Sequence, residues 1–143
     1  MAASLEQRIL SEGPDTVAAM IVEPIMGAGG VLPPPATYFE KIQAVLKKYE
    51  VLLIADEVIC GFGRTGNTWG TTTFGLSPDM MSCAKAMSSG YLPIGAVTVS
   101  QEIYGGAQPA VRENRRLQPR LFEPWVIPFP SARRSSSMKA KSI

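Results

Sequence analysis

Three charged residues, two carboxylates and one amine, each follow a short apolar run of the sequence. Together these groups could take part in catalysis. Glu23 closes the run VAAMIV, Asp56 closes VLLIA, and Lys85 closes MMSCA. A lysine amine that loses water at the rim of an apolar layer has a lowered pKa and becomes a nucleophile towards an aldehyde. A nearby carboxylate can pair with a protonated ring nitrogen. This set suggests a site, and a purely structural Asp–Lys ion pair at a sheet edge remains the open alternative.

These charges meet only if the apolar runs are neighbouring strands of one sheet. Each run is short and continuously apolar, as expected of a strand buried on both faces. The runs are 17–23, 51–56, 80–84 and 94–100, and the glycine- and threonine-rich stretch 61–79 is expected to be a long loop. Residues 36–50 repeat apolar side chains at helical intervals, with Thr37 and Glu40 at capping-box spacing. The alternation predicts an α/β fold with a mostly parallel sheet and flanking helices, in which the carboxyl ends of the strands form the ligand crevice.

Composition limits the classes of function. The 143 residues are 45% hydrophobic and 18% charged, as in one globular domain. There is no histidine, and Cys60 and Cys83 form no CxxC pair, so we expect no metal site, no disulfide framework and a cytoplasmic location. Glu23 and Pro24 interrupt the longest apolar stretch, so no membrane span is expected. Glu6 precedes any apolar run, which argues against a signal peptide.

The charge divides the chain into two parts. Residues 1–104 carry six Lys or Arg against ten Asp or Glu, a net charge of −4, whereas residues 105–143 carry eight against two, a net charge of +6. The second part has five prolines and no sustained apolar period, which predicts an irregular, disordered basic tail that proteases remove. No aromatic interleaving accompanies its arginines, so nucleic-acid binding is not expected.

Two stretches carry a resemblance to a known family. LLIADEVICGFGRTG, followed by SPDMMSCAKAMSSGYLPIGAV, closely resembles the class III (omega) aminotransferases, which are pyridoxal-phosphate enzymes of fold type I. The resemblance runs from about Val17 to about Tyr104. It implies that residues 1–104 are a part of the cofactor-binding large domain of such an enzyme.

The resemblance also assigns roles to individual residues. It places Asp56 at the ring nitrogen of pyridoxal phosphate and Lys85 as the Schiff-base lysine. Val58 matches the apolar residue that packs on one face of the ring. Ile59 stands where the family often has a glutamine that contacts the ring hydroxyl, as in the branch resembling β-alanine, GABA or amine–pyruvate transaminases. Glu23 matches an acid that in many members pairs with a substrate-binding arginine.

The implied activity is a ping-pong transfer of an amino group from an omega-amino acid or amine to an α-keto acid such as pyruvate, in a homodimer. The family's phosphate-binding segment and its C-terminal segment have no match here. A second hypothesis therefore stays open, that of a catalytically inactive truncated fragment that acts only by association with full-length relatives.

Two other motifs are expected to be decoys. Gly61, Gly63 and Gly66 spell G-x-G-x-x-G, but a dinucleotide site needs such glycines directly at the end of a strand and opening a helix. The neighbours Asp56 and Glu57 are not expected to act as paired carboxylates, because adjacent strand residues point to opposite faces. We expect Glu57 to be structural, with Arg64 as its partner.

Overall fold

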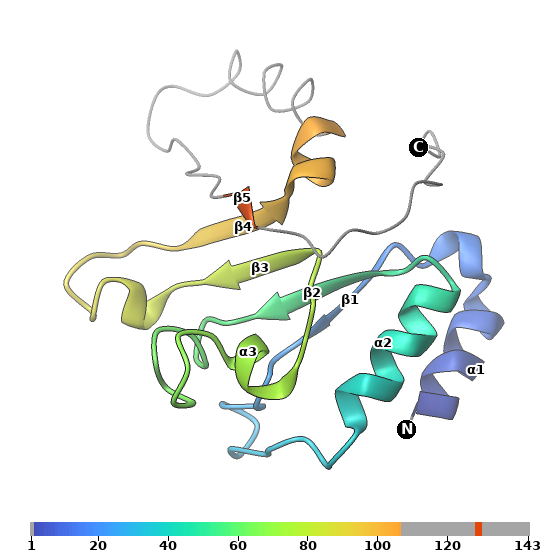
Figure 1. Cartoon of the computed structure of the whole chain (residues 1–143), viewed down its shortest axis with the longest axis horizontal. Helices are drawn as coiled ribbons and strands as arrows, with labels where there is room; N and C mark the ends of the chain where they lie inside the picture. Colours follow the sequence, from blue (N-terminus) through green and yellow to red (C-terminus); the bar gives the residue numbers. More distant parts are fainter. Residues whose placement is uncertain (1, 107–127, 130–143) are drawn as a thin grey trace.

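The computed structural model describes residues 2–106 and 128–129 (Figure 1). The elements in chain order are α1 (Ala2–Glu12), η1 (Pro14–Thr16), β1 (Ala19–Val22), α2 (Tyr38–Lys48), β2 (Leu52–Asp56), α3 (Gly70–Phe74), β3 (Met80–Cys83), η2 (Lys85–Met87), β4 (Ala96–Ser100) and β5 (Pro128–Phe129). The predicted irregular tail, residues 105–143, falls mostly outside the described residues.

The strands form one sheet in the order β1-β2-β3-β4-β5. β1, β2 and β3 are parallel to their neighbours, β4 is antiparallel to β3, and β5 runs parallel to β4. The predicted α/β fold with a mostly parallel sheet is therefore confirmed (Figure 1). Because β1, β2 and β3 run in the same direction, their carboxyl ends lie at one edge of the sheet.

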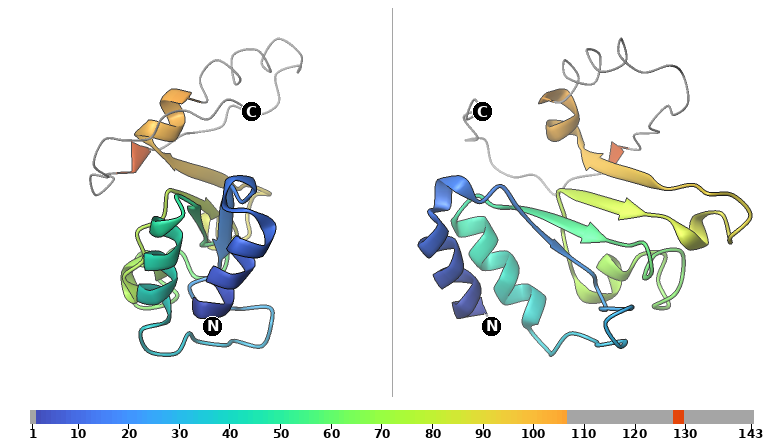
Figure 2. Two further views of the ribbon diagram at one scale, coloured as in Figure 1. Left: turned by 90° about the vertical axis from the view of Figure 1, so that its right-hand side faces the viewer. Right: turned by 180° about the vertical axis from the view of Figure 1, so that it is seen from behind.

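Helices cover one face of this sheet. Figures 1 and 2 show α1 and α2 side by side next to β1 and β2. The amphipathic pattern of α2 directs Phe39, Ile42 and Leu46 inward, and these side chains join Ile9 of α1 and Leu53 of β2 in the buried core. The core thus anchors β2, the strand that ends in Asp56.

The opposite face is open in the part of the chain that the structure describes. Strand register places Ile21 beside Ile54, and Ile54 beside Met80. These three residues are on the face opposite Leu53, because successive side chains alternate. Ile21 is 61% exposed, whereas Leu53 is 2% exposed. Among the described helices, none has the length and apolar character that crossing a bilayer requires.

Two local predictions are wrong. Thr37 is the N-cap residue of α2 but forms no side-chain capping hydrogen bond, because its backbone is left-handed (φ 63°) rather than extended. The stretch expected to be loop between β2 and β3 contains α3. Its first residues, Gly70 and Thr71, are buried, and no local capping residue signals its start.

Candidate active site

The three charged residues lie at the carboxyl ends of three neighbouring strands. Glu23 directly follows β1, Asp56 is the last residue of β2, and Lys85 opens η2 shortly after β3. Val22 pairs with Ala55, so Glu23 and Asp56 lie beside each other. The backbone positions of the three residues therefore lie at the same edge of the sheet, as predicted, because the strands before them are parallel.

Asp56 has a defined orientation. Its Oδ1 accepts a hydrogen bond from the backbone N–H of Val58 at 3.0 Å and another from the Ser82 hydroxyl at 3.2 Å. Both bonds use the same oxygen, and Oδ2 has no hydrogen-bond partner among the described residues. The carboxylate is half-buried. A half-buried, oriented carboxylate with one oxygen available fits the protonated nitrogen of a pyridoxal phosphate ring.

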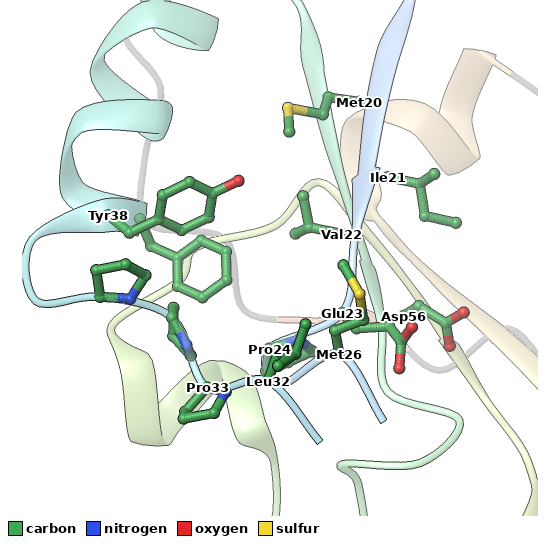
Figure 3. A pocket seen from close by; sticks show the side chains of 13 residues that line it. Met20, Ile21, Val22, Glu23, Pro24, Met26, Leu32, Pro33, Tyr38 and Asp56 are labelled. Carbon is green, nitrogen blue, oxygen red and sulfur yellow. The ribbon is translucent and has the colours of Figure 1, made fainter. Parts of the chain in front are cut away.

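An open cavity brings Glu23 and Asp56 together (Figure 3). It has a volume of about 520 Å³ and lies against β1, the residues that follow β1, and the start of α2. Apolar residues make up most of its wall: Met20, Ile21, Val22, Pro24, Met26, Leu32, Pro33, Pro34, Pro35, Tyr38 and Phe39. Glu23 is itself held in place, because its Oε2 accepts a hydrogen bond from the N–H of Gly27 at 2.8 Å. Glu23 and Asp56 both border this cavity, and Figure 3 shows their carboxylates on the Ile21 side of β1, across the strand from Tyr38.

Lys85 does not line this cavity. The sequence predicted that the Lys85 amine would be shielded from water. Among the described residues nothing shields it, and its side chain is exposed. No described residue forms an ion pair with Lys85, which removes the structural Asp–Lys pair as its explanation within these residues. Its backbone has φ 45°, a left-handed conformation that five other non-glycine residues of the described chain also adopt.

Val58 and Ile59 are half-buried in the turn after β2, outside the cavity wall. The Val58 backbone contributes to the site through its bond to Asp56. Ile59 packs on the glycine-rich loop after β1, so closely that a Cβ at Gly27 would lie 2.7 Å from its Cδ1. A larger residue at position 27 would therefore force the Ile59 side chain to shift, in the loop whose Gly27 N–H also holds Glu23.

Glu57 is structural, as predicted, but its partner is not Arg64. The side chain of Glu57 is fully buried, and its two oxygens accept hydrogen bonds from the backbone N–H groups of Gly70 at 3.0 Å and Thr71 at 2.6 Å. It supplies the cap that the sequence around α3 lacks. Arg64 instead donates from Nε to the carbonyl oxygen of Ile59 at 2.7 Å.

The other sequence features are also structural. Cys60 and Cys83 are buried, as expected, and burial raises the pKa of both thiols. The Cys60 Sγ lies 3.4 Å from both the N–H and the carbonyl oxygen of Ile25, which ties the turn after β2 to the loop after β1. The G-x-G-x-x-G glycines lie in turns, and the next helix begins only at Gly70.

Ser82 is the residue of the site that sequence reasoning missed. It lies in the middle of an apolar strand, where a small hydroxyl side chain attracts little attention. No local pattern signalled it, because Ser82 and Asp56 are 26 residues apart and their pairing, which puts both side chains on one face, appears only in the folded sheet.

Comparison with known proteins identifies the family. Residues 1–112 match the family model "Aminotransferase class-III". The chain is 65% identical over 103 residues to gamma aminobutyrate transaminase 3, chloroplastic, of Solanum lycopersicum, and 62% identical over 103 residues to the mitochondrial transaminase 1 of the same species. Each match covers 72% of this chain and 20% of the relative, so the chain spans about a fifth of the length of these curated relatives.

Solved structures agree with this assignment. The omega transaminase of Pseudomonas jessenii in complex with PMP superimposes with a TM-score of 0.76 and 54% identity, over 80% of this chain and 25% of that chain. A structure described as "Transaminase with L-ala" gives a TM-score of 0.74 and 51% identity, over 81% of this chain and 30% of that chain. The fold is therefore that of a part of a pyridoxal-phosphate-dependent transaminase. The chain belongs to the class-III aminotransferase family.

Proposed function

We propose that this chain carries the lysine and aspartate half of a transaminase site that moves an amino group from an omega-amino acid or amine to an α-keto acid such as pyruvate. The names of the relatives point to gamma-aminobutyrate as the type of donor. Pyridoxal phosphate is the proposed cofactor, and when bound it supplies an electron sink for the pair left on the amino-bearing carbon.

Lys85 and Asp56 have the central roles in this proposal. The Lys85 amine would hold the cofactor by condensing with its aldehyde, with loss of water, and as a free amine it would carry a proton to or from the substrate carbon. Its exposed side chain, without an ion-pair partner among the described residues, is free to do this. The Asp56 Oδ2 accepts the hydrogen bond of the protonated ring nitrogen.

The remaining predicted residues have supporting roles. Val58 would pack on one face of the ring, and its backbone N–H holds the Asp56 carboxylate. Ile59 provides no polar group for the ring hydroxyl and is instead committed to packing on Gly27. Glu23 lies on the substrate side of the cavity, and its bond to Gly27 leaves Oε1 to pair with a cationic group.

The observation that carries the proposal is the hydrogen bonding of the Asp56 carboxylate. Its Oδ1 takes two hydrogen bonds and its Oδ2 takes none from the described residues, which leaves Oδ2 available to a further donor at the end of β2. That end is where ligands of parallel α/β sheets bind.

Capture of the cofactor is the first test. The purified chain is mixed with pyridoxal phosphate, reduced with borohydride and digested, and the modified peptide is located by mass spectrometry. We expect the label on Lys85 and its loss in Lys85→Ala. Lys41→Ala, which removes an exposed helical lysine, is the matched control and keeps the label. Uniform labelling of many lysines, unchanged in Lys85→Ala, would contradict the proposal.

Turnover is the second test, and it separates the two hypotheses kept open by the sequence. The amino donor gamma-aminobutyrate and the acceptor pyruvate are supplied, and alanine formation is followed. Alanine formation that depends on Lys85 supports a catalytic chain. Capture at Lys85 without alanine formation supports the alternative, a chain that acts only by association with a full-length relative.

Assembly and location belong to the same proposal. We propose a homodimer, which analytical ultracentrifugation tests directly through the mass of the particle. The relatives are named as chloroplastic and mitochondrial proteins, whereas composition led us to expect the cytoplasm. A fluorescent fusion expressed in cells decides between the cytoplasm and an organelle.

A further inference from the structure

Ser82 contacts the last residue of β2 and the residue that follows it. Its hydroxyl donates to the Asp56 Oδ1 at 3.2 Å, and its carbonyl oxygen accepts from the N–H of Glu57 at 2.8 Å. Ser82 pairs with Asp56 in the register of β2 and β3, so both side chains lie on the open face of the sheet. The serine side chain is half-buried.

We propose that Ser82 is a positioning residue that orients the Asp56 carboxylate towards a ring nitrogen of the cofactor. This inference rests on the function proposed above and adds to it a residue that the sequence did not single out. The N–H of Val58 and the hydroxyl of Ser82 approach the same carboxylate oxygen from two different segments of the chain. Two donors fix the rotation of a carboxylate group better than one, and they keep Oδ2 directed away from both donors.

The chemistry of the donors supports this role. The Ser82 hydroxyl adds a second hydrogen bond to Oδ1, and at 3.2 Å it is longer than a typical O–H···O bond, so we expect it to affect the direction of the carboxylate more than the stability of the chain. The backbone donor of Val58 is present whatever side chain occupies position 58, whereas the second donor depends on the residue at position 82. One of the two hydrogen bonds that orient Asp56 therefore depends on a single replaceable side chain.

A structural role for the hydroxyl is the competing explanation, because a hydrogen bond between strands also stabilises a sheet. The two roles differ in what they affect. A positioning role acts only on ligands whose ring nitrogen carries a proton. A structural role affects every ligand of the site equally, together with the stability of the chain.

The test measures binding of two ligands by calorimetry. Pyridoxamine phosphate has the ring nitrogen, and its analogue with a C–H group in place of that nitrogen has no donor for Asp56. The variants are Ser82→Ala and a matched pair of nearly equal shape, Ser82→Thr and Ser82→Val. Thermal unfolding of each variant is recorded separately.

We expect Ser82→Ala and Ser82→Val to weaken binding of pyridoxamine phosphate about fivefold, and Ser82→Thr to restore it, because only threonine keeps the hydroxyl. All variants should bind the C–H analogue equally. In an Asp56→Ala background, replacing Ser82 should have no further effect.

Two results would overturn the inference alone. One is equal binding of pyridoxamine phosphate by the unchanged chain and Ser82→Ala, and the other is an equal loss for both ligands. If the unchanged chain binds neither ligand, the proposed function fails and this inference fails with it.

Discussion

The two faces of the sheet come from the same strands and yet have different surroundings. Leu53 and Ile54 are neighbours in β2, and Leu53 is 2% exposed in the core under α1 and α2, whereas Ile54 is half-buried on the open face. Asp56 and Ser82 belong to the open face. The covered face therefore stabilises this fold, while the open face presents the polar groups proposed to bind the cofactor.

The largest expected effect is on the covered face. Leu53→Ala removes a core side chain, and we expect the free energy of unfolding to fall by about 3 kcal/mol. Ile54→Ala, the matched control on the open face, should lower it by about 1 kcal/mol, because this side chain keeps more of its contact with water. Urea unfolding followed by circular dichroism measures both. Equal losses for the two variants would remove the distinction between the faces.

The second-largest effect is expected for Glu57, a buried carboxyl side chain. Glu57→Ala leaves the N–H groups of Gly70 and Thr71 without their acceptors, so we expect a loss of about 2 kcal/mol in the free energy of unfolding. Glu40→Ala, an exposed position in the first turn of α2, should change it by less than about 1 kcal/mol. Hydrogen exchange should also show faster exchange at Gly70 and Thr71 in Glu57→Ala. Unchanged exchange there would mean that another acceptor replaces the carboxylate.

The reactivity of a thiol on each face of the sheet measures how accessible that face is to reagents in solution. Cys83 lies on the covered side and is 5% exposed, and burial raises its pKa, so the thiol stays protonated and unreactive near pH 8. We expect Cys83 to react with iodoacetamide at least about tenfold more slowly than a cysteine introduced by Val97→Cys, whose position is 49% exposed. Peptide mass spectrometry separates the two sites. Similar rates would show that the covered face opens readily.

The smallest effect concerns a surface pair that joins α1 to α2. Glu6 accepts hydrogen bonds from Lys48 at 2.6 Å and Tyr49 at 2.9 Å, and these donors lower its pKa. A carboxyl group with a lowered pKa contributes stability above its unfolded-state pKa, and that contribution is lost as the pH falls through its folded-state pKa. The urea midpoints of the unchanged chain and Glu6→Gln should therefore differ slightly at pH 6, and the difference should shrink steadily as the pH is lowered below the ordinary pKa of a glutamate. A difference that does not change with pH would assign the effect to packing.

Local patterns in the sequence determined much of the fold. Continuous apolar runs predicted β1, β2, β3 and β4, and helical periodicity predicted α2, because backbone geometry imposes a period on the side chains of each element. The family motif around Asp56 and Lys85 also lies in contiguous stretches, and the match to the family model confirmed the resemblance to class III aminotransferases. The roles of these two residues remain proposals with the tests given above.

Only the tertiary structure decided which distant groups meet. Glu57 caps α3 across 13 residues, and Ser82 reaches Asp56 across 26, because strand register and loop packing bring together atoms that no sequence period relates. The same holds for the left-handed backbone of Thr37, which removes a cap that the local spacing predicted. Periodicity is a property of one element, whereas a hydrogen bond between elements depends on how the whole core packs.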